Sequence, residues 1–195
     1  CARLKDKKKL EICLFKNPSG LRLFTKKLKV CWWTDMLYVK ITEQMLEKAT
    51  RKAVSMGKIR NSITHGQGNI SGFLGEEIVN HFLNGKQQNT YDYDIVKSDT
   101  KIDVKTKRCT SKPKSYYDCS IAKTSLHQKC DKYVFVRIEW HKERPDEWKN
   151  AWILGELSKK DYFKKSRELT KGQVDPSNNF TVKADCYNVA IKDLD

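Results

Sequence analysis

The sequence lacks any long apolar run free of charged residues, and it lacks cysteine pairs of the Cys-x-x-Cys type. A transmembrane helix, which needs about 20 consecutive apolar residues, is therefore not expected. No secretory signal pattern is visible, because Lys16 and Lys26 interrupt the apolar stretches near the start of the chain. The seven cysteines are an odd number. This argues against a disulfide framework and predicts a reducing, cytoplasmic location.

Several common catalytic motifs are also missing. The sequence contains no phosphate-binding P-loop, no dinucleotide-binding glycine fingerprint, no His-Glu-x-x-His motif and no Gly-x-Ser-x-Gly elbow. The four histidines are scattered along the chain and form no cluster in the sequence. Candidate chemistry must therefore come from acidic and basic side chains.

Basic residues are abundant. The chain has 39 Lys and Arg against 24 Asp and Glu, which gives a net charge of +15 in 195 residues. Such an excess favours a polyanionic partner, with nucleic acid as the first hypothesis and DNA ahead of RNA. A lysine-rich surface with no such partner is the competing interpretation.

The pattern of apolar residues predicts two regions. Residues 1–35 are interpreted either as a hairpin extension or as a leader that is not native to the domain, and residues 36–195 as the main domain. Two helices are expected first, over 41–56 after a Thr42 cap and over 71–83 before Asn84-Gly85. The remaining expected elements are strands at 91–97, 101–108, 116–122, 132–140, 152–157 and 180–191, with a short helix at 158–166. This order predicts an α+β fold with a mixed β-sheet core flanked by helices.

An acid and a lysine alternate with apolar residues in the segment 102–105. In a strand, alternate side chains share a face, so Asp103 and Lys105 point one way while Ile102 and Val104 point the other. A carboxylate and an ammonium are thus expected side by side on a core strand.

A second acid is expected opposite the first. If Ser98-Asp99 forms a two-residue hairpin loop, Asp94 lies directly across from Asp103. Like charges in that arrangement destabilise a sheet unless they are compensated. A hard divalent cation such as Mg²⁺ supplies that compensation. The register is an assumption at this point, since a slip of one residue would separate the two acids.

The helix at 71–83 offers a third carboxylate, and two residues compete for the role. Helical geometry places Glu76 nearer the apolar stripe than Glu77, which favours Glu76. The small residues Gly72 and Gly75 are expected to let this helix approach the sheet closely.

Three segments together resemble the PD-(D/E)XK nuclease superfamily, of the restriction-endonuclease-like kind found in phages and bacteria. They are Gly72-Phe-Leu-Gly-Glu76, Tyr91-Asp-Tyr-Asp94-Ile-Val and Ile102-Asp103-Val-Lys105-Thr-Lys107. The resemblance covers about residues 60–140. It implies an α/β/α fold around a four-stranded mixed sheet. It further implies Mg²⁺ or Mn²⁺ held by Glu76, Asp94 and Asp103, with Lys105 completing the catalytic set. No proline precedes Asp94, and Asp92 remains its rival.

Further basic residues follow these acids and could contact nucleic acid. Gln128 is a weaker candidate for a place near the sheet, and the basic loop at 58–69 is another contact candidate. The expected nucleic-acid-binding residues, with two tyrosines behind them for stacking, are Lys107, Arg108, Lys112, Lys114, Tyr116 and Tyr117.

The favoured hypothesis is a metal-dependent nuclease, an endonuclease acting on DNA in the cytoplasm of a bacterial or phage-infected cell. A homodimer is compatible with this hypothesis. The alternative is a nucleic-acid-binding protein that has a nuclease-like fold but no catalytic activity.

Overall fold

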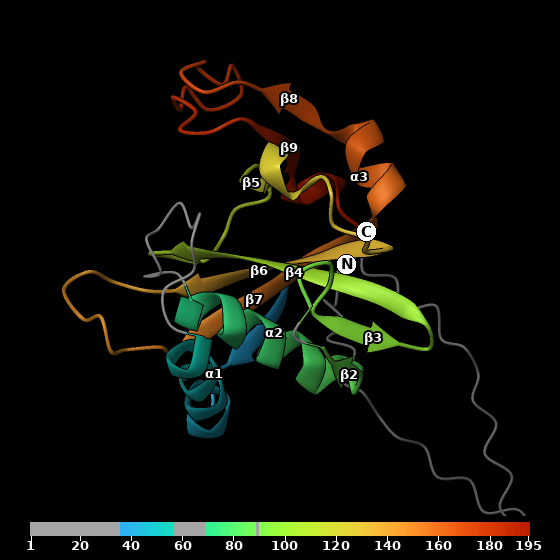
Figure 1. Cartoon of the computed structure of the whole chain (residues 1–195). Helices are drawn as coiled ribbons and strands as arrows, with labels where there is room; N and C mark the ends of the chain where they lie inside the picture. Colours follow the sequence, from blue (N-terminus) through green and yellow to red (C-terminus); the bar gives the residue numbers. More distant parts are fainter. Residues whose placement is uncertain (1–35, 57–68, 89) are drawn as a thin grey trace, which may run out of the picture. The chain divides into compact units, whose positions relative to one another are not determined.

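The computed structural model describes residues 36–56, 69–88 and 90–195 (Figure 1). The predicted extension at 1–35 and nearly all of the predicted basic loop at 58–69 lie outside the described residues. The helices are α1 (Glu43–Met56), α2 (Asn69–Leu83) and α3 (Lys159–Lys165), with short 3-10 turns η1 (Lys123–Ser125) and η2 (Ile191–Asp193). The strands are β1 (Leu37–Lys40), β2 (Lys86–Gln87), β3 (Ile95–Lys97), β4 (Thr100–Cys109), β5 (Asp118–Ala122), β6 (Lys132–Glu139), β7 (Asn150–Ser158), β8 (Arg167–Leu169) and β9 (Cys186–Ala190).

The described strands form two sheets. The larger has the order β1-β7-β6-β4-β3-β2, and the smaller has the order β5-β9-β8. Only the β4–β6 pairing is parallel among the described strands, so the large sheet is mixed. The predicted α+β class is confirmed, although the sheet has six strands where the resemblance implies four. The short strands β1, β2 and β8 were not predicted.

Local signals set the ends of the helices as expected. The Thr42 hydroxyl accepts a hydrogen bond of 3.2 Å from the backbone N–H of Met45, which caps the start of α1. Asn84 follows α2 with a φ of 50°, a left-handed conformation that asparagine tolerates. Ser158 caps α3 by accepting from the N–H of Asp161.

The hairpin of β3 and β4 has the predicted register. Ser98 and Asp99 have φ values of 46° and 66°, as both central residues of a type I′ turn require. Ile95 consequently pairs with Ile102, and the N–H of Asp94 donates to the carbonyl of Ile102 at 2.9 Å. A local turn thus brings the segment containing Asp94 alongside the start of β4.

The large sheet is covered on both faces. Val134 and Val136 of β6 pack with α1 and α2, in one apolar cluster. Tyr133 and Phe135, which alternate with them, pack with Tyr162 of α3 and with residues of β5 and β9 in a second cluster. Figure 1 shows α1 and α2 on one side of this sheet and α3 with the smaller sheet on the other. The second face is therefore covered by α3 together with the strands of the smaller sheet.

Helix α2 and strand β4 approach each other closely at Gly75. A Cβ atom there would lie 1.9 Å from the Thr106 Oγ1, which only a shift of Thr106 or the helix could relieve. At Gly72, by contrast, no described atom beyond the adjacent residues and the backbone of the same helix lies within 4 Å of such a Cβ. The expected close approach thus holds for Gly75 and not for Gly72.

Membrane insertion was not expected from the sequence. In the described ranges, no helix combines the length and the apolar character that crossing a membrane requires.

Gly75→Ala is predicted to lower the free energy of unfolding by about 1–3 kcal/mol, because the added methyl group overpacks the contact with Thr106. Gly72→Ala is the matched control in the same helix. It should be neutral or stabilising by up to about 1 kcal/mol, because alanine favours a helix. Urea denaturation of the two variants measures the difference.

Thr106→Ala provides a further check on the same contact. The Thr106 Oγ1 is buried and has no hydrogen-bond partner among the described residues. Its removal therefore breaks no hydrogen bond with them. Combining Thr106→Ala with Gly75→Ala should recover part of the lost stability. Equal effects of Gly72→Ala and Gly75→Ala would contradict the close approach.

Candidate functional site

Asp103 lies in the middle of the large sheet and is almost completely buried, with 2% of its surface exposed. Its Oδ2 lies 2.7 Å from the Nζ of Lys105, two residues further along β4. The contact has the distance of an ion pair but not the geometry of a hydrogen bond, so Oδ2 has no hydrogen-bond donor among the described residues. The two residues share one face of the strand, as their alternation predicts.

Gln128 joins these two side chains. Its Nε2 donates to the Oδ1 of Asp103 at 2.9 Å, and its Oε1 accepts from the Nζ of Lys105 at 2.8 Å. The backbone carbonyl of Gln128 in turn accepts from the Nζ of Lys159. Gln128 thus has a definite position beside the acid and the lysine, which the sequence only suggested.

Asp94 lies beside this group. Its Oδ2 accepts a 2.7 Å hydrogen bond from the backbone N–H of Val104. Burial raises the pKa of Asp94, and the nearby charge of Asp103 raises it further. Asp92 instead accepts from the backbone N–H of Lys129 at 3.3 Å. Of the two rivals, Asp94 is the one that hydrogen-bonds to the strand carrying Asp103.

The two glutamates of α2 have different surroundings. Glu77 is buried and pairs with Lys52 of α1, with 2.7 Å between Oε1 and Nζ. Burial also raises the pKa of Glu76, and the next largest contribution comes from the negative charge of Asp94. Glu76 therefore belongs electrostatically with Asp94 and Asp103, whereas Glu77 contacts the neighbouring helix.

The donor set has the chemistry of a site for a hard divalent cation. Three carboxyl groups that repel one another, with one buried oxygen lacking a hydrogen bond, would be stabilised by a positive ion. In the described part of the chain, however, no three Asp, Glu, His or Cys side chains converge closely enough to enclose one ion. The Lys105 ammonium is the cation that lies against Asp103.

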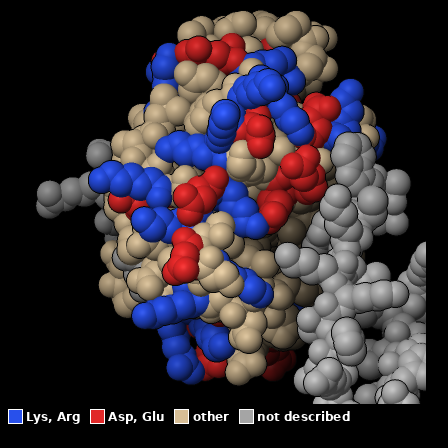
Figure 2. All heavy atoms as spheres, turned by 90° about the vertical axis from the view of Figure 1, so that its right-hand side faces the viewer, with Lys and Arg blue, Asp and Glu red and all other residues tan. Residues whose placement is uncertain are grey.

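The predicted basic contact residues have different surroundings. Arg108 stacks over the ring of Trp140 at 4.2 Å, and Lys114 lies 5.7 Å from the ring of Tyr116. Lys112 is exposed in the loop after β4, while Lys107 lines a pocket. Figure 2 shows Lys and Arg interspersed with Asp and Glu over one face of the molecule.

Lys52 and Arg137 are the functional candidates that sequence reasoning missed. Lys52 reduces the pKa elevation of both Glu76 and Asp94, so its ammonium acts on the candidate site. Lys52 lies three residues after the buried Ala49 and therefore near the inward face of α1. This spacing is the feature of the sequence that could have identified it. No local sequence feature identifies Arg137, because only the parallel pairing of β6 with β4 places it beside Lys107.

Comparison of the chain with protein-family models, with curated proteins and with solved structures finds no match. The resemblance to PD-(D/E)XK nucleases therefore remains a prediction from the sequence motifs alone.

The raised pKa of Glu76 predicts that stability depends on pH in the absence of metal. The value is about 8, against an ordinary 4.5, so the folded state retains a proton that the unfolded state loses. Stability should therefore fall as pH rises from about 4.5 to about 8. Glu76→Gln should raise the melting temperature relative to wild type by about 3 °C at pH 8, with less effect at pH 5.

Glu77→Gln is the matched control for this measurement, made with EDTA present. It breaks the buried ion pair with Lys52 and should lower the melting temperature at pH 8. If Glu76→Gln shifts the melting temperature equally at both pH values, the pKa of Glu76 is not raised in the folded protein.

Proposed function

We propose that this protein is a metal-dependent nuclease that hydrolyses phosphodiester bonds in DNA. The observation that carries the proposal is the contact of Asp103 with Lys105 and Gln128, beside the perturbed carboxyls of Asp94 and Glu76. Acids with raised pKa values, gathered around a buried ion pair, are more typical of an active site than of a structural core.

The three carboxyl groups of Glu76, Asp94 and Asp103 would hold Mg²⁺ or Mn²⁺. Such an ion, when bound, polarises a phosphate oxygen and lowers the pKa of a water molecule. Lys105 would stabilise negative charge that develops on the phosphate or orient the attacking water. Gln128 would hold the Lys105 ammonium in position, because its Oε1 accepts a hydrogen bond from it.

A second candidate function is nucleic-acid binding without cleavage. It is supported by the lack of a ready three-ligand metal cluster among the described residues, and by the ion pair that engages Lys105. Both candidates agree with the net charge of +15. The proposal also includes DNA in preference to RNA, a cytoplasmic location and endonucleolytic action, and it is compatible with a homodimer.

Asp103→Asn is predicted to abolish cleavage while preserving DNA binding. The substitution keeps the side-chain shape and the acceptor for Gln128 but removes the charge that a metal needs. Activity on supercoiled plasmid, branched DNA and RNA, with Mg²⁺, Mn²⁺ or EDTA, should fall by about 100-fold or more. Binding, measured in EDTA, should be equal or tighter, because one negative charge no longer repels phosphate.

Asp99→Asn is the matched control for Asp103→Asn. It removes one exposed carboxylate from the same hairpin, and asparagine suits its positive φ of 66°. Its cleavage rate should equal that of the wild type. Identical purification of all proteins excludes a contaminating nuclease, and cleavage by Asp103→Asn at the wild-type rate would refute the catalytic assignment.

Lys105→Ala tests the metal site independently of activity. Without metal, it leaves the buried Asp103 carboxylate unpaired and should lower stability by about 3–5 kcal/mol. Because an ammonium no longer competes for Oδ2, Mg²⁺ or Mn²⁺ should raise the melting temperature more in this variant than in wild type. Cleavage should be lost.

Lys101→Ala removes the same charge from an exposed position on β4 and is the control for Lys105→Ala. It should match wild type in cleavage and in the response of its melting temperature to metal. Should neither wild type nor Lys105→Ala respond to either ion, the metal assignment fails and binding without cleavage becomes the better account.

A further inference from the structure

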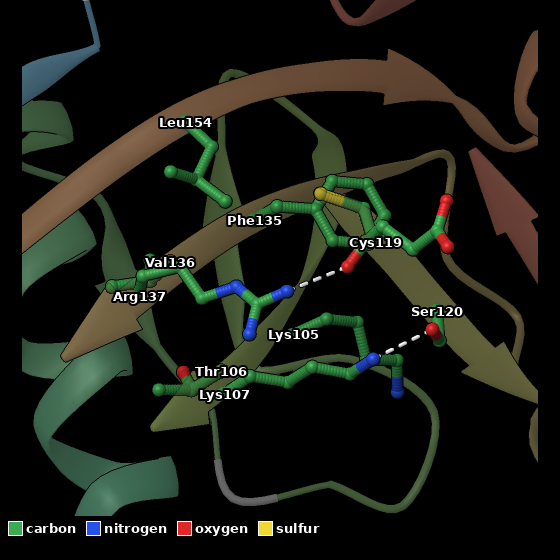
Figure 3. A pocket seen from close by; sticks show the side chains of 10 residues that line it. Lys105, Thr106, Lys107, Cys119, Ser120, Phe135, Val136, Arg137 and Leu154 are labelled. Carbon is green, nitrogen blue, oxygen red and sulfur yellow. Dashed lines mark hydrogen bonds between the residues drawn. The ribbon is translucent and has the colours of Figure 1, made fainter. Parts of the chain in front are cut away.

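A pocket of about 90 Å³ adjoins the candidate site on the face of the large sheet that carries Asp103 and Lys105. It is lined by side chains from β4, β5, β6 and β7, including three cations, Lys105, Lys107 and Arg137. Figure 3 shows the Lys107 and Arg137 side chains extending toward β5, where Ser120 lies. Lys105 lines this pocket and also contacts Asp103, so the pocket is adjacent to the candidate active site.

Lys107 and Arg137 have only neutral hydrogen-bond partners among the described residues. The Nζ of Lys107 donates to the Ser120 hydroxyl at 2.6 Å, and the Nη2 of Arg137 donates to the backbone carbonyl of Asp118 at 2.7 Å. The Asp118 carboxylate is engaged elsewhere. It pairs with Arg167 at 2.9 Å and accepts from Asn178 at 2.8 Å.

The two cations are also close to each other. Lys107 and Arg137 are register partners in the parallel pairing of β4 with β6, so their side chains lie on the same face. Although the Lys107 side chain is exposed, the protein packed around it lowers its pKa, and the nearby charge of Arg137 lowers it further. Two like charges beside a cavity, neither of them in an ion pair within the described structure, are stabilised by an anion, although the Asp118 carboxylate that also lines the pocket partly offsets them.

We propose that this pocket binds a backbone phosphate of a nucleic-acid strand, one nucleotide from the bond that the Asp103 site cleaves. The inference rests on the proposed function. Two residues along a strand span about 6.6 Å, so Lys107 is displaced from Lys105 by about the separation of neighbouring phosphates in one strand. One water molecule needs a cavity of about 10–15 Å³. The pocket volume of about 90 Å³ therefore leaves room for a phosphate group.

The position of the pocket favours a flexible strand. Phe135 and Leu154 line it together with the polar groups, and it lies between the large sheet and β5. A phosphate can enter beside Lys107, whose side chain is exposed. A single strand can bend one phosphate into such a recess, whereas a rigid duplex presents its phosphates on an outer surface. The preferred ligand is thus single-stranded or locally unpaired nucleic acid.

The test measures binding of a fluorescent 12-nucleotide single-stranded DNA in EDTA, across a range of salt concentrations. Lys107→Gln keeps a hydrogen-bonding group for Ser120 but removes the charge. The dissociation constant should rise by about tenfold at low salt, and the salt slope should fall by about 0.7. Lys107→Arg should restore binding. Lys160→Gln, which removes an exposed charge from α3, should bind as wild type does.

A second measurement locates the phosphate. A neutral methylphosphonate is placed at each backbone position of the same DNA in turn. In wild type, the substitution should weaken binding most at one position next to the cleaved bond. In Lys107→Gln, a methylphosphonate at that position should not raise the dissociation constant further, because the charge that contacted this phosphate is already absent.

The outcomes separate this inference from the nuclease proposal, because binding in EDTA does not require cleavage. If wild type cleaves DNA but Lys107→Gln keeps the wild-type dissociation constant and salt slope, the pocket assignment is overturned and the nuclease proposal stands. If Lys107→Gln weakens binding of inorganic phosphate but not of DNA, the pocket is a free-anion site and the assignment is equally overturned. If the methylphosphonate effect depends on Lys107 but no cleavage occurs, the pocket binds a backbone phosphate, but its placement next to a cleaved bond is overturned together with the nuclease proposal.

Discussion

The buried carboxylate of Asp103 is the constraint on which the arrangement of the candidate site depends. A charge that is 2% exposed is stable only if nearby groups compensate it. Lys105 supplies an opposite charge and Gln128 supplies a hydrogen bond. Gln128 must be held in turn, and the Lys159 ammonium contacts its carbonyl. One ionised side chain thus links β4 to the segment after η1 and to the start of α3.

Strand β4 distributes two kinds of side chain to two faces of the sheet. Ile102 and Val104 pack into the cluster with α1 and α2, while Asp103, Lys105 and Lys107 face the other way. The first set stabilises the fold. The second set includes a buried acid and crowded cations, which cost stability and are typical of a site that binds a charged ligand.

The basic residues illustrate how strand geometry divides what looks continuous in the sequence. Lys107 and Arg108 are adjacent, yet one lines the pocket and the other stacks on Trp140. Adjacent side chains of a strand point to opposite faces, so a charged run that begins inside a strand cannot form one contact surface. The net charge of the chain therefore does not by itself indicate where a partner would bind.

The sequence by itself determined the features that arise within a few residues of one another. The two-residue turn at Ser98-Asp99 fixed the register that brings Asp94 near Asp103, and strand alternation placed Lys105 beside that acid. Apolar periodicity likewise gave the helices and most strands. Tertiary structure alone decided that Gln128 bridges Asp103 and Lys105, that Lys52 acts on the acids, and that Arg137 joins Lys107. Each of these contacts joins segments that are distant in sequence. Helix packing and parallel strand pairing leave no local sequence pattern that predicts the register or the partner.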